Sequence, residues 1–153
     1  MVAKYLSLCL FLVLISGSAF GQATDAKKLS HLRISEDLRA RLIERLNLFI
    51  EYELSQQYEK QYDLLATKCP ANLQCGHASR EEYVEGKRNI RNSLGILLEL
   101  KVKGIDKKLQ ENCAFLSLSP KLRKDNVVFS YATVTIACLQ DGDWYFRFWF
   151  VDI

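Results

Sequence analysis

Residues 127–151 read VVFSYATVTIACLQDGDWYFRFWFV, and this stretch decides the fold. Both of its halves are rich in the β-branched and aromatic residues that favour strands. Asp141-Gly142 between them is a two-residue hairpin signal. We therefore expect one strand over 127–139, a tight turn, and a last strand over 143–151. The sequence predicts an antiparallel sheet at the carboxyl end of the chain.

The turn also determines which side chains share a face of the sheet. A two-residue loop places Gln140 opposite Asp143, and the remaining pairs follow from that register. The first face carries Thr133, Thr135, Ala137, Leu139, Trp144, Phe146, Phe148 and Phe150, and the second carries Ala132, Val134, Ile136, Cys138, Tyr145, Arg147, Trp149 and Val151. Both faces are mostly apolar, whereas a sheet covered on one side alternates cleanly. We expect helices to cover one face, and a pocket lid or a second subunit to cover the other.

The residues before this sheet follow helical periodicity. Ser35 is a favourable N-cap followed by acidic residues, and apolar side chains then recur at three- and four-residue spacing up to Leu54. A second helix is expected over 57–67. A third begins at Ser79, because Ser79 and Glu82 have the spacing of a capping box. These segments predict amphipathic helices that lie on the sheet.

Between the helices and the final hairpin, the apolar period changes to two. Residues 96–103 alternate apolar and polar side chains, which predicts a half-buried strand. Residues 113–118 form a shorter strand candidate, and a polar loop is expected over 119–126. Helices followed by a run of strands are typical of the α+β class.

The first 21 residues have the three parts of a secretory signal peptide. Lys4 supplies a positive start, residues 5–15 are almost wholly apolar, and small residues follow up to Gly21. We expect cleavage between Gly21 and Gln22 and a secreted or periplasmic product. The alternative is an uncleaved membrane anchor, but the apolar run is shorter than the ~20 helical residues that span a bilayer.

The rest of the chain is expected to hold one domain. Residues 22–34 are polar without periodicity, so we interpret them as a flexible arm, and 35–153 as a single domain. The whole chain has a formal net charge of +3, to which the leader contributes Lys4. A nearly neutral mature chain predicts neither nucleic-acid binding nor stable membrane association.

Export would place the cysteines in an oxidising compartment. Cys69, Cys75, Cys113 and Cys138 remain after cleavage, and an even number in an oxidising compartment favours disulfides. Four cysteines allow three connectivities; a local Cys69–Cys75 bridge is easily closed, whereas Cys113 and Cys138 depend on an unknown strand register. A metal site at Cys69, Cys75 and His77 is the alternative, but three ligands at this spacing are unusual for zinc. We expect no metal and no cofactor.

Aromatic and cationic residues supply the candidate ligand or partner site. The candidates are Tyr58, Tyr62, Tyr83, Tyr145, Arg147 and Trp149. Tyrosines at helical spacing place hydroxyls at a pocket rim, although such residues more often belong to the core. Arg147 lies between two aromatic residues and suits an anionic ligand or a partner's carboxylate; the alternative is a surface arginine lying across its neighbours.

Three short stretches resemble the nuclear-transport-factor-2-like superfamily, which includes ketosteroid-isomerase and polyketide-cyclase types. LSQQYEKQYDLL at 54–65 looks like the turn between its first two helices, SREEYV at 79–84 like the start of its third, and DGDW at 141–144 like its last hairpin. The resemblance covers roughly 35–151 and points to small exported bacterial members of unknown function. It implies N-terminal helices packed on a curved antiparallel β-sheet, a cone with a pocket at its open end.

Enzymes of that superfamily place an Asp, His or Tyr in the pocket, and this chain departs from the pattern. Its histidines are His31 and His77, and no Asp lies centrally in the last two predicted strands. We therefore expect a non-catalytic domain that binds a small apolar ligand or a protein partner, with a homodimer through the sheet. The alternatives are a small isomerase or dehydratase, and a secreted inhibitor of the related cystatin type.

Overall fold

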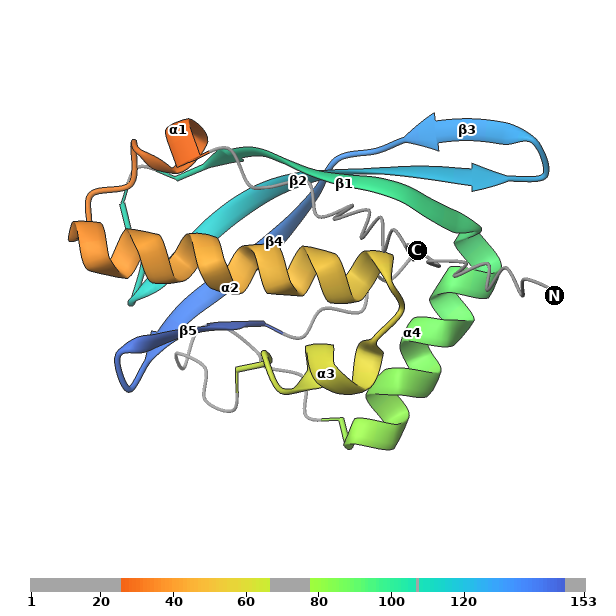
Figure 1. Ribbon diagram of the computed structural model, residues 1–153, viewed down its shortest axis with the longest axis horizontal. Helices are drawn as coiled ribbons and strands as arrows, with labels where there is room; N and C mark the ends of the chain where they lie inside the picture. The colour runs from red at the N-terminus through yellow and green to blue at the C-terminus, as the bar shows by residue number, and fades with distance from the viewer. Residues whose placement is uncertain (1–25, 67–77, 107, 148–153) are drawn as a thin grey trace, which may run out of the picture.

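The computed structural model describes residues 26–66, 78–106 and 108–147, and it is an α+β domain (Figure 1). Helices precede strands along the chain, as expected. The elements are α1 (Ala26–Leu29), α2 (Glu36–Leu54), α3 (Tyr58–Tyr62), α4 (Arg80–Leu94), β1 (Ile96–Ile105), β2 (Cys113–Lys124), β3 (Val127–Ser130), β4 (Thr133–Gln140) and β5 (Asp143–Phe146). The strands form one curved antiparallel sheet of order β1-β2-β4-β5, and β3 pairs with β2.

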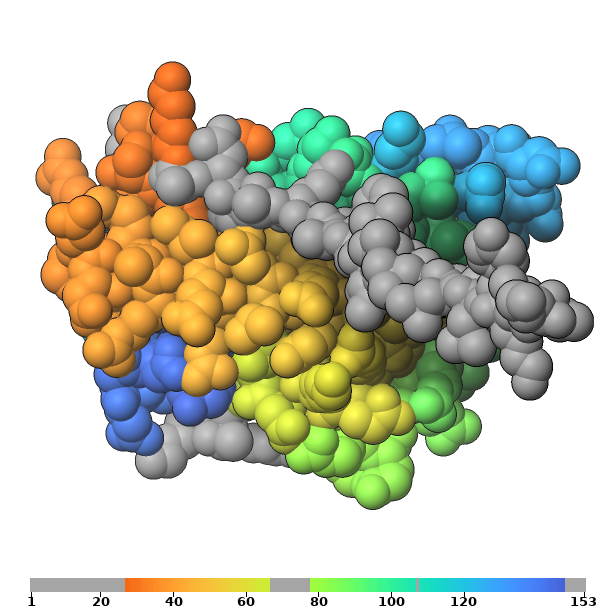
Figure 2. Space-filling view, viewed as in Figure 1, coloured from red at the N-terminus to blue at the C-terminus, as the bar shows by residue number. Residues whose placement is uncertain are grey.

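The helices lie on one side of this sheet. Helix α2 runs across it, α3 follows at its end, and α4 stands at a steep angle to α2 near the start of β1 (Figure 1). Figure 2 shows α2 occupying much of the viewed face, with β5 along one of its margins. The main core lies between α2 and the sheet, where the apolar stripe of α2 buries Leu42, Leu46, Phe49 and Ile50.

Both predicted N-caps, Ser35 and Ser79, are confirmed. The Ser35 side chain accepts a hydrogen bond from the Leu38 backbone N–H at 3.3 Å. Ser79 and Glu82 form the expected capping box, in which each side chain accepts a bond from the other residue's backbone N–H. Such caps satisfy N–H groups that a helix leaves without internal partners.

The register of the final hairpin is confirmed in the described residues. Gln140 pairs with Asp143 and Leu139 with Trp144. Trp144 is fully buried beneath α2, and its indole N–H donates to the Leu38 carbonyl at 2.8 Å. This bond fixes the start of α2 to β5.

The long strand expected over 127–139 is instead two strands, β3 and β4. Both pair with β2 in the same register, but the pairing is interrupted between them. The interruption is at Tyr131 and Ala132, which lie opposite Pro120 and Ser119 respectively. Proline has no backbone N–H to give to the ladder, which explains why pairing stops there. All four residues of β3 are exposed.

The polar loop expected over 119–126 is also wrong, because β2 continues to Lys124. The loop contains only Asp125 and Asn126, whose φ angles are 48° and 68°. Asp and Asn tolerate this left-handed conformation, so they close a two-residue hairpin without glycine.

Two N-terminal expectations are corrected. The predicted helix over 57–67 ends at Tyr62, and the chain then runs beside β5: the Ala66 N–H donates to the Phe146 carbonyl and the Phe146 N–H to the Leu64 carbonyl, both at 2.7 Å. Of the arm expected over 22–34, the described part is folded. Helix α1 and the turn after it bury Leu29 and Leu32 against the core.

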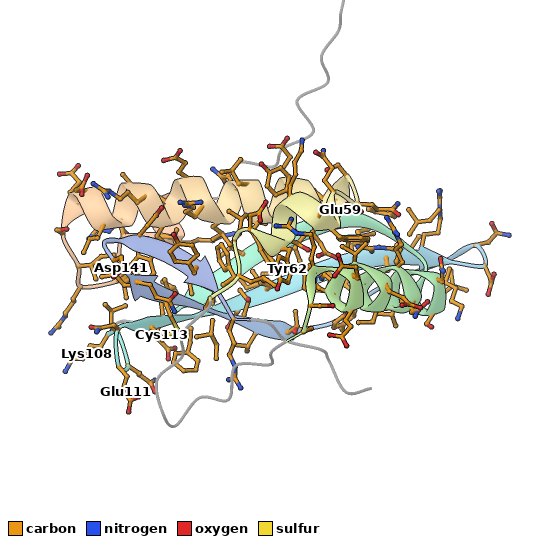
Figure 3. The ribbon with its side chains drawn as sticks, turned by 90° about the horizontal axis from the view of Figure 1, so that it is seen from below. Glu59, Tyr62, Lys108, Glu111, Cys113 and Asp141 are labelled. Carbon is orange, nitrogen blue, oxygen red and sulfur yellow. A yellow bond between two sulfur atoms is a disulfide. The ribbon has the colours of Figure 1, made fainter. Side chains whose placement is uncertain are left out.

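A disulfide joins Cys113 of β2 to Cys138 of β4, with the two Cα atoms 4.0 Å apart. The residues are direct cross-strand partners. Both backbone groups of Cys113 bond to Gln110 instead of β4, so this pair belongs to the closely spaced, non-hydrogen-bonded kind. Figure 3 places Cys113 at the end of the sheet away from α4. The favoured Cys69–Cys75 bridge lies outside the described residues.

Candidate ligand-binding pocket

A pocket of about 130 Å³ opens between α4, the end of α2 and the sheet, and is partly open to solvent. Most of its wall is apolar. The apolar lining residues are Phe49, Leu65, Ile90, Leu94, Leu97, Leu100, Leu118, Pro120, Leu122 and Val134. They come from two helices and three strands, so the packing of the whole domain shapes the cavity.

A buried cluster of charges forms the other side of the pocket. The Glu53 carboxylate from α2 pairs with Lys87 Nζ at 2.5 Å and with Arg91 Nη2 at 2.8 Å, both from α4. Only 13% of the Glu53 side chain is exposed, with 18% for Lys87 and 12% for Arg91. Arg91 Nη2 also lies 3.5 Å from the Glu53 backbone carbonyl. The cluster therefore ties α4 to the end of α2.

Gln61 of α3 completes this network from a fully buried position. Its Nε2 donates to the Glu53 carboxylate at 2.9 Å and to the Phe49 carbonyl at 3.1 Å. Its Oε1 accepts a bond from the Tyr83 hydroxyl at 2.7 Å. A buried amide that uses both donor and acceptor in this way holds its neighbours in one arrangement.

The surroundings shift two pKa values in opposite directions. Burial alone would raise the pKa of Glu53, but Lys87, Gln61 and Arg91 together outweigh it, and the pKa lies below its usual value. Burial is also the main cause that raises the pKa of the Tyr83 hydroxyl, assisted by the nearby Glu53 charge. At neutral pH the carboxylate is ionised and the phenol is protonated.

The sequence positions the charged residues by helical spacing. Glu53 follows Phe49 by four residues and Ile50 by three, so it lies on the buried stripe of α2. Tyr83, Lys87 and Arg91 are successive fourth residues on one face of α4. Sequence reasoning missed Glu53, Lys87 and Arg91, although a charge on an apolar stripe was the signal that could have found Glu53.

The structure brings only some of the candidate site residues together. Tyr83 and Arg147 line the pocket. Tyr58 is buried behind the pocket, where its hydroxyl accepts a bond from Arg91 Nε at 3.3 Å. Tyr62 (labelled in Figure 3) packs on Tyr83 with ring centroids 5.6 Å apart, and its hydroxyl donates to the Ala78 carbonyl at 2.9 Å. Tyr58 and Tyr62 thus support the pocket without lining it.

The remaining candidates belong to the second face of the sheet. Tyr145 lies opposite Cys138 and beneath the guanidinium of Arg45, 5.6 Å from its ring centroid. Trp149 is outside the described residues. Of the apolar residues on this face, Val134 is 49% exposed, whereas Ile136 is 4% exposed and packs within the chain against both disulfide cysteines. The homodimer through this face stays a prediction.

The described residues contain neither a cluster of side chains suited to holding a metal ion nor a helix long and apolar enough to cross a bilayer. The proposed ligands Cys69, Cys75 and His77 lie outside those residues. No known family model matches the sequence, and no curated protein is significantly similar to it.

Proposed function

We propose that this chain is an exported, non-catalytic domain that binds a small ligand, built on the cone-shaped nuclear-transport-factor-2-like plan. The observation that carries the proposal is the pocket between α4 and the sheet, with its apolar wall and a few converging polar groups. This combination of a largely apolar cavity and few placed polar groups is typical of small-molecule sites. Helices on one side of a curved antiparallel sheet agree with the fold that the resemblance implies.

The pocket volume sets the size of the ligand. At about 130 Å³ it is close to the ~150 Å³ of an engineered apolar cavity that accommodates benzene. A single ring or a short branched chain is therefore the expected occupant, and larger molecules would need to extend through the open side.

The state of the buried polar groups supports binding over catalysis. An effective general base has a pKa near the working pH and a free lone pair facing the substrate. Glu53 instead has a lowered pKa and accepts bonds from three side chains. Tyr83 has a raised pKa, and its hydroxyl donates a hydrogen bond to Gln61. Neither group is arranged as the proton acceptor that the isomerase or dehydratase alternative requires.

The proposal is tested by filling the cavity. Thr133 lines the pocket from β4, and Thr133→Phe would occupy the space that a ring-sized ligand needs. We expect toluene to raise the melting temperature of the wild-type protein saturably, because a ligand that binds only the folded state stabilises it. The Thr133→Phe variant should lose at least tenfold in toluene affinity, measured by chemical-shift titration.

Ser117→Phe is the matched control, since it adds the same ring to the exposed second face of β2. It should leave toluene affinity unchanged within twofold. A wild-type protein that shows no saturable response to toluene, or a Thr133→Phe variant that binds it normally, would contradict the proposed pocket.

The export part of the proposal has its own test. When the full chain is expressed with its leader, we expect the mature protein to begin at Gln22, as read by mass spectrometry of the intact product. Recovery of a cytosolic chain that retains Met1 would contradict export and leave the pocket proposal standing.

A further inference from the structure

The charged side of the pocket retains hydrogen-bond donors for which the described part of the chain supplies no acceptor. In Arg91, Nε donates to Tyr58 and Nη2 to Glu53, whereas Nη1 makes no hydrogen bond among the described residues. Lys87 Nζ carries three N–H groups and contacts one oxygen there, Glu53 Oε2. Both side chains are largely buried, so little water can reach these donors.

Most of the acceptor capacity in the same cluster is already used. The Glu53 carboxylate already accepts bonds from Lys87, Arg91 and Gln61. The Gln61 carbonyl oxygen accepts the Tyr83 hydroxyl. The unused polar capacity is therefore mainly of the donor kind, and its natural complement is a ligand group that only accepts hydrogen bonds.

The charge of the lining points the same way. Two cationic residues of α4, Lys87 and Arg91, share the single carboxylate of Glu53 at the pocket wall. Glu53 neutralises one of these positive charges, which leaves an excess of about one within the cluster. A negative ligand group would reduce this excess, and charge-assisted hydrogen bonds are about twice as strong as neutral ones.

We propose that the ligand is a small apolar carboxylic acid bound as its anion. Its carboxylate would accept hydrogen bonds from Lys87 Nζ and Arg91 Nη1, and its ring or short chain would lie against Leu97, Leu100 and Leu118 of the sheet. This inference rests on the proposed function, because it names the ligand class of the same pocket.

The test compares benzoate with benzamide, which has nearly the same shape and no charge. At pH 7 and low salt we expect calorimetry to give at least tenfold tighter binding for benzoate than for benzamide. Benzylamine, the cationic counterpart, should bind more weakly than either. The benzoate preference should shrink as salt is added, since salt screens charges in a partly open site.

Substitutions of Lys87 then test whether its positive charge is responsible for the benzoate preference. Lys87→Met should weaken benzoate binding about tenfold and benzamide binding less than twofold, whereas Lys87→Arg should retain the benzoate preference. Lys108→Met is the control, because Lys108 is exposed at the end of the sheet far from α4 (Figure 3). If Lys87→Met fails to fold, the Lys87→Arg result and the salt dependence still test whether a positive charge at this position binds benzoate.

Three outcomes separate this inference from the proposed function. Toluene and benzamide binding without a benzoate preference would overturn the anion inference and keep the pocket. A benzoate preference unaffected by Lys87→Met would overturn the assignment to this cluster. Failure of toluene, benzamide and benzoate alike would overturn both proposals.

Discussion

Replacing Glu53 by glutamine is expected to lower the free energy of unfolding by about 3 kcal/mol at pH 7. The substitution keeps the size of the side chain but leaves Lys87 and Arg91 largely buried without a balancing charge. Breaking one partner of a buried ion pair costs far more than the pair itself contributes. Urea denaturation followed by tryptophan fluorescence would measure the loss.

Glu59→Gln is the matched control. Glu59 of α3 (Figure 3) also pairs with an α4 cation, Arg88 at 3.0 Å, but both side chains are exposed. Exposed pairs contribute roughly 0–1 kcal/mol, so this variant should lose little. Equal losses in the Glu53 and Glu59 variants would show that burial of the cluster has no energetic consequence.

The difference in unfolding free energy between the wild type and Glu53→Gln is expected to depend on pH. Because the folded pKa of Glu53 is lowered, the unfolded state takes up the proton first as pH falls. The Glu53 contribution is therefore complete above the unfolded pKa of about 4.3 and disappears as pH falls through the lower folded pKa. The stability gap between wild type and Glu53→Gln should narrow in acid. A gap that widens below pH 4 would contradict this sign.

Removing the Cys113–Cys138 disulfide is expected to cost about 3 kcal/mol. The bond closes a loop with a sequence separation of 25, and a cross-link of that span reduces the conformational entropy of the unfolded chain by roughly this amount. The double variant Cys113→Ala, Cys138→Ala should show it as a lower urea midpoint under non-reducing conditions.

A relocated bond provides the control. Ser117 and Val134 are paired four residues further along the same two strands and on the same face. Cysteines at those positions in the double-alanine background should form a new disulfide and recover most of the lost stability. A double-alanine variant as stable as wild type would show that the native bond does not constrain the unfolded chain.

Local signals predicted the parts of the fold that depend on few residues. Asp141-Gly142 determined the β4–β5 register, because a two-residue loop leaves one pairing. Ser35 and Ser79 marked helix starts, because capping involves only the next three residues. The disulfide was different: it needs the β2–β4 register, which depends on the Asp125-Asn126 turn and on the ladder continuing past Pro120. Neither Asp125-Asn126 nor the sequence around Pro120 predicts a hairpin as clearly as a turn that contains glycine.

The candidate site was predicted in part for a similar reason. Tyr83 and Arg147 stood out as single residues, and both line the pocket. Lys87 and Arg91 resemble ordinary solvated charges when α4 is considered alone, whereas Glu53 lies on the apolar stripe of α2. They become a buried cluster only when α4 lies beside the end of α2, an arrangement that no local pattern encodes.

The interruption opposite Pro120 has a mechanical consequence. On one side of the interruption, the Cys113–Cys138 disulfide cross-links the sheet, and the Trp144 indole bonds it to α2. On the other side, the β2–β3 hairpin has no disulfide and no such bond to α2 among the described residues, and β3 is exposed. Pro120 and Tyr131 sit at this junction, and both face the pocket. A bound molecule would contact both sides of the interruption at once and so add a link between them, beside the one that β1 makes by pairing with β2 across Pro120.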